Sequence, residues 1–245
     1  MRSFVVPLDP AAIVRTLAAG HRPAHPHLLG HDDEPSPVPA VTDPNGAPVL
    51  LLRNDSAVAD HLRNLDDGIA LRYDDRLPVP DAPWLGSAWI CGWAEPVPDQ
   101  EVTALAAAFA DRRPVTELFG LGDTHSLWRI EPVEVRLEDD EGVFEIEVEH
   151  YVAATADTWY PLETNLIMDL TVHHIEALDG LLHRIRHQIP DADHITPLRM
   201  DGQGTVIDVH CRDGERRRFL VRHHRNVMSP SHVLHSLACC ACNHD

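Results

Sequence analysis

The sequence predicts an α+β protein in two parts, a small antiparallel β-barrel over residues 1–160 and a small α-β-β-β-α domain over residues 161–245. The first part reads as strands with a few short helices between them. It lacks the regular alternation of strand and helix that a doubly wound sheet requires, so a barrel fits better. The second part reads as a helix, three short strands and a closing helix that opens at Ser229-Pro230.

Local signals predict the elements of the first part. Asp9 is a good N-cap and Pro10 fits the first helical position, so a short helix begins there. Residues 21–37, rich in His, Pro and acid, read as a loop or an edge strand. Asp43-Pro44-Asn45-Gly46 lies between two strand patterns and predicts a hairpin. The other predicted elements are helices over 55–65, 101–110 and 149–155 and strands over 69–73, 84–97, 126–137 and 143–148.

In the second part, a single helix is predicted over 166–189. Its apolar stripe is formed by Leu166, Leu170, His174, Leu178, Leu181, Ile185 and Ile189. Pro190 ends this helix, because proline cannot continue the hydrogen-bond ladder. Strands are predicted over 195–200, 205–211 and 217–222, with Asp-Gly turns between them. Trp159-Tyr160-Pro161 marks the expected domain boundary.

Charge and composition exclude several classes of function. The formal net charge is −19, which argues against a nucleic-acid partner, because phosphate binding needs clustered cations. All basic residues are Arg, so Schiff-base chemistry and a phosphate-binding Lys are excluded. No run approaches the roughly 18 apolar residues of a membrane span, and the first residues lack a secretory pattern. We therefore expect a cytoplasmic protein without a membrane partner.

The tail of the chain carries a candidate zinc site. His232, His235, Cys239 and Cys242 are spaced three, four and three residues apart, which places them on one helix face. Imidazole and thiolate are zinc ligands. One helix rarely supplies four ligands to one ion, because such a stripe is about 15 Å long. The alternative is an exposed tail beside an apolar face.

Two segments resemble a known family. VLLLRNDSAVADHLRNL resembles the strand-then-helix signature of the pyridoxamine-phosphate-oxidase-like FMN-binding split barrels, and is closest to their haem-utilisation (HugZ-like) branch. Ser56, His61 and Asn64 stand at its polar positions. The block HHIEAL…DADHITPLRMDGQGTVIDVH…RRRFLVRH resembles the small C-terminal domain of the same proteins. The resemblance implies a split β-barrel, a homodimer, and a tetrapyrrole or flavin ligand.

The resemblance also implies cofactor-binding residues. His174 matches the helix His of the family, and His244 lies where a tail His of haem-utilisation relatives ligates iron. His61 belongs to the barrel signature, and a guanidinium such as that of Arg129 can pair with a propionate or phosphate. The alternatives are a hydrogen-bonded structural His and an ion pair of Arg129 with Glu131, Glu134 or a partner chain. FMN is less favoured than haem, because few cations are available for its phosphate.

Three functions remain open. The first is a haem-binding protein involved in haem handling or degradation. The second is a cofactor-free protein-interaction module on a degenerate barrel, and the third and weaker one is an FMN-dependent oxidoreductase. No complete catalytic constellation is visible, so the sequence does not decide whether the protein is an enzyme. The aromatic strand with Trp84, Trp89 and Trp93 predicts a homodimer through the barrel.

Overall fold

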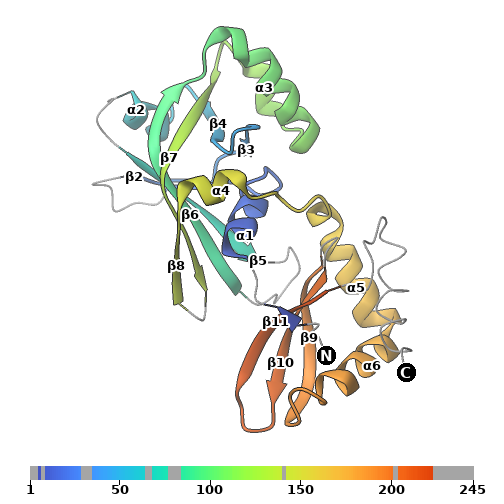
Figure 1. The fold of residues 1–245 in the computed structure, drawn as a ribbon. Helices are drawn as coiled ribbons and strands as arrows, with labels where there is room; N and C mark the ends of the chain where they lie inside the picture. Colours follow the sequence, from blue (N-terminus) through green and yellow to red (C-terminus); the bar gives the residue numbers. More distant parts are fainter. Residues whose placement is uncertain are drawn as a thin grey trace. The chain divides into compact units, whose positions relative to one another are not determined.

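The computed structural model describes residues 5–6, 9–28, 35–63, 68–76, 84–139, 142–200 and 204–222 (Figure 1). The chain divides into two compact units, which are described separately. The large unit comprises Asp9–Leu77 and Asp81–Ala156, and the small unit comprises Met1–Leu8, Pro78–Pro80 and Asp157–Asp245. Within the described ranges, no helix is both long and apolar enough to cross a membrane.

The large unit is built on one antiparallel sheet. Its strand order is β2-β5-β6-β7-β4-β3, and β8 also pairs with β7. In chain order its elements are α1 (Pro10–Leu17), β2 (His25–Leu28), β3 (Ala40–Thr42), β4 (Pro48–Arg53), α2 (Ala57–Leu62), β5 (Ile69–Arg76), β6 (Trp84–Pro96), α3 (Asp99–Arg112), the 3₁₀ helix η1 (Thr116–Gly120), β7 (His125–Asp139), β8 (Gly142–Ile146) and α4 (Val148–Ala153). The strands are thus separated by short helices without βαβ alternation, as predicted.

Strand β7 organises this sheet. Along one edge it pairs with β6 through Trp128–Glu138. Along the other edge its first half, His125–Arg129, pairs with β4, and its second half, Val135–Asp139, pairs with β8. One long strand therefore joins two separate partners on the same side, and the ribbon shows the resulting bent sheet (Figure 1).

The local signals of the first part are confirmed. Asp9 caps α1, because its carboxylate accepts a hydrogen bond from the Ala11 N–H at 3.0 Å. The predicted hairpin is β3–β4, and the Asp43 carboxylate accepts from the N–H groups of Asn45 and Ala47, each at 2.9 Å. The buried Tyr151 hydroxyl of α4 donates to the Gly46 carbonyl at 2.8 Å. The turn is therefore fixed both by its own Asp and by a helix distant in sequence.

An apolar cluster holds α3 against the β3–β4–β7 part of the sheet. Phe109 and Leu105 of α3 are buried there with residues from these strands and with the residue that follows β6, namely Val41, Val49, Leu51, Leu127 and Val97. Phe109 is completely buried. Full burial of such a side chain contributes roughly 1.5–3 kcal/mol of hydrophobic stabilisation.

The small unit has an antiparallel sheet in the order β1-β11-β10-β9. Its elements are β1 (Val5–Val6), the 3₁₀ helix η2 (Tyr160–Leu162), α5 (Glu163–His173), α6 (Ile175–Ile185), β9 (Ala192–Met200), β10 (Gly204–Cys211) and β11 (Arg216–Arg222). Leu181 and Ile185 of α6 pack on Ile207, Val209 and Val221 of the sheet. The three predicted strands are present, whereas the predicted closing helix lies outside the described residues.

The prediction of one continuous helix over 166–189 was wrong. The chain breaks at His174, whose backbone has φ −132° and ψ 42°, and two helices result. The break changes which side chains face inward. Leu170, Leu181, Ile185 and Ile189 are buried as expected, but Ile167 and Ala177 take the buried positions expected for Leu166 and Leu178, which are only half-buried.

Candidate functional site

A pocket of about 540 Å³ opens in the large unit beside the β4–α2 turn. Its walls are mostly apolar and come from the chain before β3, from β4 and from α2; they include Pro35, Pro37, Val38, Pro39, Leu51, Leu52, Ala57 and Val58. Its polar lining consists of Ser36, Arg53, Ser56, Glu117 and His125. The volume lies in the range of small-molecule sites, which are concave, mainly apolar and equipped with a few polar groups.

Arg53 and His125 lie directly opposite one another. They are Cα partners in the antiparallel register of β4 and β7. Side chains of such partners are neighbours, with Cβ atoms about 4.5–5.5 Å apart. The sheet therefore brings one guanidinium and one imidazole to the same wall of the pocket.

The imidazole of His125 is held by its surroundings. Its Nδ1 lies 2.9 Å from the Thr124 hydroxyl oxygen. A methyl group at Gly120 would meet this hydroxyl at 2.3 Å and the Nδ1 of His125 at 2.6 Å. The absence of a side chain at Gly120 thus permits the position of the ring. With Nδ1 engaged, Nε2 is the nitrogen that is left to bind a ligand.

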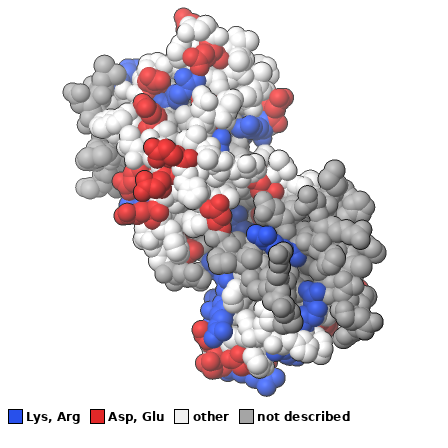
Figure 2. Space-filling view, viewed as in Figure 1, with Lys and Arg blue, Asp and Glu red and all other residues white. Residues whose placement is uncertain are grey.

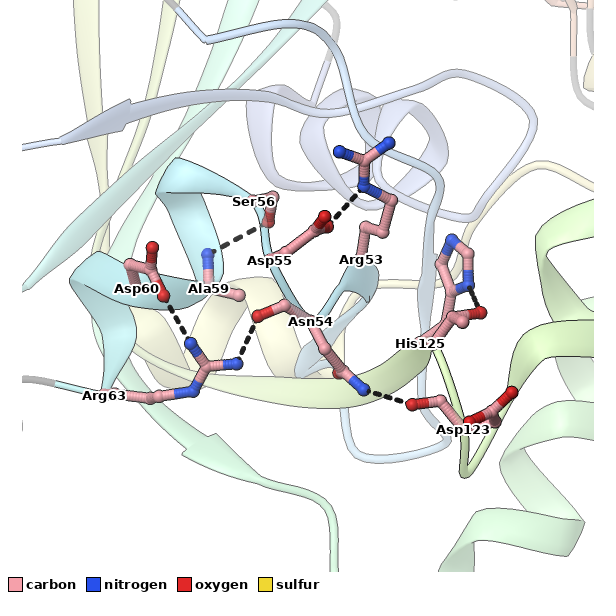
Figure 3. A network of polar contacts seen from close by, with 10 residues as sticks. Arg53, Asn54, Asp55, Ser56, Ala59, Asp60, Arg63, Asp123 and His125 are labelled. Atoms are coloured by element: carbon pink, nitrogen blue, oxygen red, sulfur yellow. Dashed lines mark hydrogen bonds and ion pairs between the residues drawn. The ribbon is translucent and has the colours of Figure 1, made fainter.

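A polar network connects the β4–α2 turn to the turn before β7 (Figure 3). The side-chain amide of Asn54 donates to the Asp123 carbonyl, and its backbone N–H donates to the Thr124 carbonyl, both at 2.8 Å. Arg63 donates to the Asp60 carboxylate at 2.5 Å and also to the Asn54 carbonyl. These contacts fix the two walls that carry Arg53 and His125.

Figure 3 shows two further contacts at this turn, a helix cap and an ion pair. The Ser56 hydroxyl caps α2 by accepting from the Ala59 N–H at 3.2 Å. Arg53 pairs with Asp55 at 2.5 Å, but the two side chains are 63% and 73% exposed. An ion pair this exposed contributes little stability, because water screens it. The guanidinium of Arg53 can therefore exchange Asp55 for another anion at low cost.

Arg129 lies in the large unit but outside this lining. Its guanidinium pairs with Glu101 of α3 at 2.5 Å and with the buried Asp43 carboxylate at 3.2 Å. The hydrogen bond to Glu101 raises the pKa of Arg129. The expectation of an ion pair was right in kind, but Glu131 and Glu134 are not its partners here. A role for Arg129 toward a propionate or phosphate stays a prediction.

The described predicted histidines, His61 and His174, belong to different units. His61 is only 7% exposed on the inner side of α2, and it is not part of the pocket lining. His174 belongs to the small unit, at the break between α5 and α6, with Asp169 and Glu176 carboxylates 3.6 and 3.9 Å from its ring nitrogens. Its side chain is 36% exposed, so it is not the buried stripe residue that the sequence suggested. The ligand roles of both residues stay predictions.

Several predicted residues lie outside the described part of the chain. They are Asn64, His244 and the four candidate zinc ligands His232, His235, Cys239 and Cys242. Among the described residues, one group of potential metal ligands brings a Cys and two carboxylates together, namely Asp191, Cys211 and Asp213, with ligand atoms within 4.8 Å of one another. Cys211 also belongs to the apolar core of the small unit, and burial raises the pKa of its thiol, which disfavours the thiolate that metals bind.

Sequence reasoning missed the pairing of Arg53 with His125. Neither residue is among the site residues that the sequence predicts. One signal was available, because His125 follows the Gly-rich segment FGLGD at the start of a strong strand pattern. The register of β4 on β7, which creates the site, is a long-range property that the motif does not contain.

The visible surface agrees with the acidic composition. Figure 2 shows groups of acidic side chains on the large unit, with Arg side chains scattered among them. On the described part of this face, the cations do not merge into the continuous basic surface that nucleic acid would need.

Together, the sheet and the surrounding helices define an α+β protein with a split-barrel-like large sheet. The chain is similar to the structure of a heme binding protein from Mycobacterium smegmatis, with a TM-score of 0.70 and 22% sequence identity over 97% of this chain and 99% of that chain. At this identity the similarity shows the fold alone. No protein-family model matches the sequence, and no curated protein matches it.

Two further solved structures have lower TM-scores. A protein of unknown function from Agrobacterium tumefaciens gives a TM-score of 0.45 at 14% identity, over 97% of both chains. A conserved hypothetical protein from Mycobacterium tuberculosis gives 0.42 at 18% identity, over 57% of this chain and 89% of that chain. Similarity at this level carries no argument about function.

Proposed function

We propose that this protein binds haem and takes part in haem handling or breakdown, with the tetrapyrrole held in the pocket between β4, α2 and β7. The observation that carries the proposal is that a single pocket combines apolar walls with the His125 imidazole and the Arg53 guanidinium, which can exchange its Asp55 partner for another anion. Arg53 and His125 are Cα partners on neighbouring strands. The similarity over nearly the whole chain to a protein described as heme binding supports the same conclusion.

The residues of the pocket fit the chemistry of a haem. The apolar walls provide contact for the faces of a porphyrin ring. The Nε2 of His125 could hold the iron, in which case Nδ1 would be protonated and would donate to the Thr124 hydroxyl. The Arg53 guanidinium can form paired hydrogen bonds with a propionate carboxylate. When bound, the haem would supply an iron centre that coordinates small ligands.

The lining also contains one unfavourable charge. Among the described residues of the lining, Glu117 of η1 is the acidic one. A carboxylate there would repel the propionates of haem, and this makes Glu117 a useful probe of how the ligand is oriented.

A haem titration followed by the Soret band tests the proposal. We expect saturable binding of one haem per chain, lost in His125→Ala and retained in the control His150→Ala, which removes an exposed His of α4. His174→Ala and His244→Ala belong in the same series, because both remain predicted ligands. Loss of binding in either of these variants, with normal binding in His125→Ala, would show that the haem does not bind in this pocket.

The spectrum of the purified protein separates the alternatives. A Soret shift that never saturates and ignores all four substitutions would refute specific haem binding and favour the interaction module. Flavin bands in the purified protein would favour the FMN-dependent oxidoreductase.

We also propose a homodimer through the large unit. Trp89 of β6 is covered by the guanidinium groups of Arg72 and Arg136, at 5.8 and 5.1 Å from its ring. Trp84 and Trp93 of the same strand are 41% and 51% exposed. Burial of these two indoles against a second copy would remove apolar surface from water. Sedimentation at micromolar concentration that shows only a 27.3 kDa species would contradict the dimer.

A further inference from the structure

Two histidines of the small unit form a pair that the haem proposal does not use. His194 of β9 and His210 of β10 are Cα partners in the antiparallel ladder. Their rings are stacked with centroids 4.1 Å apart and an interplanar angle of 13°. The side chain of His194 is 60% exposed and that of His210 is half-buried, so solvent reaches the pair.

We propose that His194 and His210 bind a divalent transition-metal ion such as Zn²⁺. Neutral imidazole is a common ligand for such ions, with a metal–nitrogen distance of about 2.0–2.1 Å. Two nitrogens on a tetrahedral ion are then about 3.3 Å apart. In the stacked arrangement the in-plane lone pairs of the two rings point side by side, so both rings must rotate before their nitrogens can face one ion. The broad χ2 torsion of His permits this rotation.

The surroundings of the pair contain both carboxylates and cations. The Asp193 carboxylate lies 3.7 Å from Nδ1 of His194 and 3.9 Å from Nε of Arg212, and it can orient the His194 ring from outside the metal shell. Arg216 stands opposite His210 on β11, but its guanidinium is paired with the buried carboxylate of Asp208. Arg218 also pairs with Asp208, at 3.5 Å, so this one carboxylate balances only one of the two guanidinium charges beside His210.

The fixed register gives the site its affinity. Both side chains start from neighbouring strands of a folded sheet, so little motion is lost when the second nitrogen binds. Joining two ligands in this way increases the affinity by about 10²-fold or more over one imidazole. The ion would bridge β9 and β10 in the folded protein only, so binding should raise the unfolding temperature of the small unit.

Titration of the full-length protein with Zn²⁺, followed through the imidazole ¹⁵N signals, tests the proposal. Besides any shifts from the predicted zinc site of the tail, we expect saturable shifts of two imidazoles that are assigned to this pair by their loss in His194→Ala and His210→Ala. Each substitution should weaken binding at the remaining ring by about 100-fold. The control His183→Ala removes an exposed His of α6 in the same unit and should leave both signals and their affinity unchanged.

Thermal unfolding gives an independent measurement. Zn²⁺ should raise the unfolding temperature of the wild type and of His183→Ala. The increase should be smaller or absent in His194→Ala. If His210→Ala does not fold, His194→Ala decides alone, because its side chain is mostly exposed. Signals of the pair that do not move with Zn²⁺, or equal affinity after His194→Ala, would overturn the proposal.

Discussion

Replacement of Gly120 by Ala is the sharpest test of the role assigned to His125. The added methyl group would lie 2.3 Å from the Thr124 hydroxyl and 2.6 Å from Nδ1 of His125, whereas ordinary contact begins at 3.4 Å. The hydroxyl, the ring or the η1 backbone must therefore move by about 1 Å. Overpacking of this size costs about 1–3 kcal/mol. If that cost falls on the ring position, haem affinity drops by about tenfold or more, because 1.4 kcal/mol corresponds to a factor of ten.

Gly122 in the same loop provides a matched control. Its φ is +84°, and a methyl group there would meet nothing within 4 Å. Gly122→Ala should therefore lower the free energy of unfolding by about 1 kcal/mol through backbone strain and leave haem affinity unchanged. Urea unfolding and Soret titration of both variants separate the two effects. Wild-type affinity in Gly120→Ala, with the protein folded, together with wild-type affinity in His125→Ala, would refute the placement of His125 as a haem ligand.

Three further predictions follow from single side chains. Glu117→Gln should strengthen haem binding severalfold by removing repulsion of the propionates, and unchanged affinity would show that they point elsewhere. Burial and the nearby Arg112 lower the pKa of His21 below its ordinary value of 6.5. As the pH falls through about 6.5, His21 is therefore protonated more readily in the unfolded chain than in the folded protein, and the free energy of unfolding decreases. The urea midpoint of His21→Gln should therefore fall less between pH 7.5 and 5.5 than that of the wild type, and an equal fall would contradict this reasoning. Leu181→Ala should cost about 2–5 kcal/mol of unfolding free energy, because Leu181 is 2% exposed. Leu178→Ala should cost clearly less, since Leu178 is only half-buried, and equal costs in thermal unfolding would contradict the placement of α6.

Local signals predicted the elements that local chemistry determines. The Asp43–Gly46 turn contains its own hydrogen-bond acceptor, so the hairpin could be recognised from four residues. The strand patterns of β5, β6 and β7 alternate because one face of each is buried. The helix break at His174 could not be recognised, because the apolar spacing continues across it without a Gly or Pro.

The features that the sequence did not reveal depend on contacts between distant residues. Arg129 was expected to pair with acidic residues of its own strand, yet its partners come from α3 and from the β3–β4 turn. The candidate pocket arises because β4 pairs with β7 in a register that sets Arg53 against His125. The Gly-rich segment before His125 does not indicate Arg53 as its partner, so only the folded sheet identifies this pair.

The pairing of β1 with β11 has a consequence for synthesis of the protein. Val6 is the register partner of Leu220, and β1 forms the edge of the small unit although the large unit follows it directly in the chain. At roughly 5–20 residues per second, a ribosome makes β11 about 10–40 s after β1. During that interval the large unit can fold while β1 remains without its partner strand β11. A fragment that starts at the large unit would also remove this edge strand, so the small unit cannot be obtained whole by cutting the chain once.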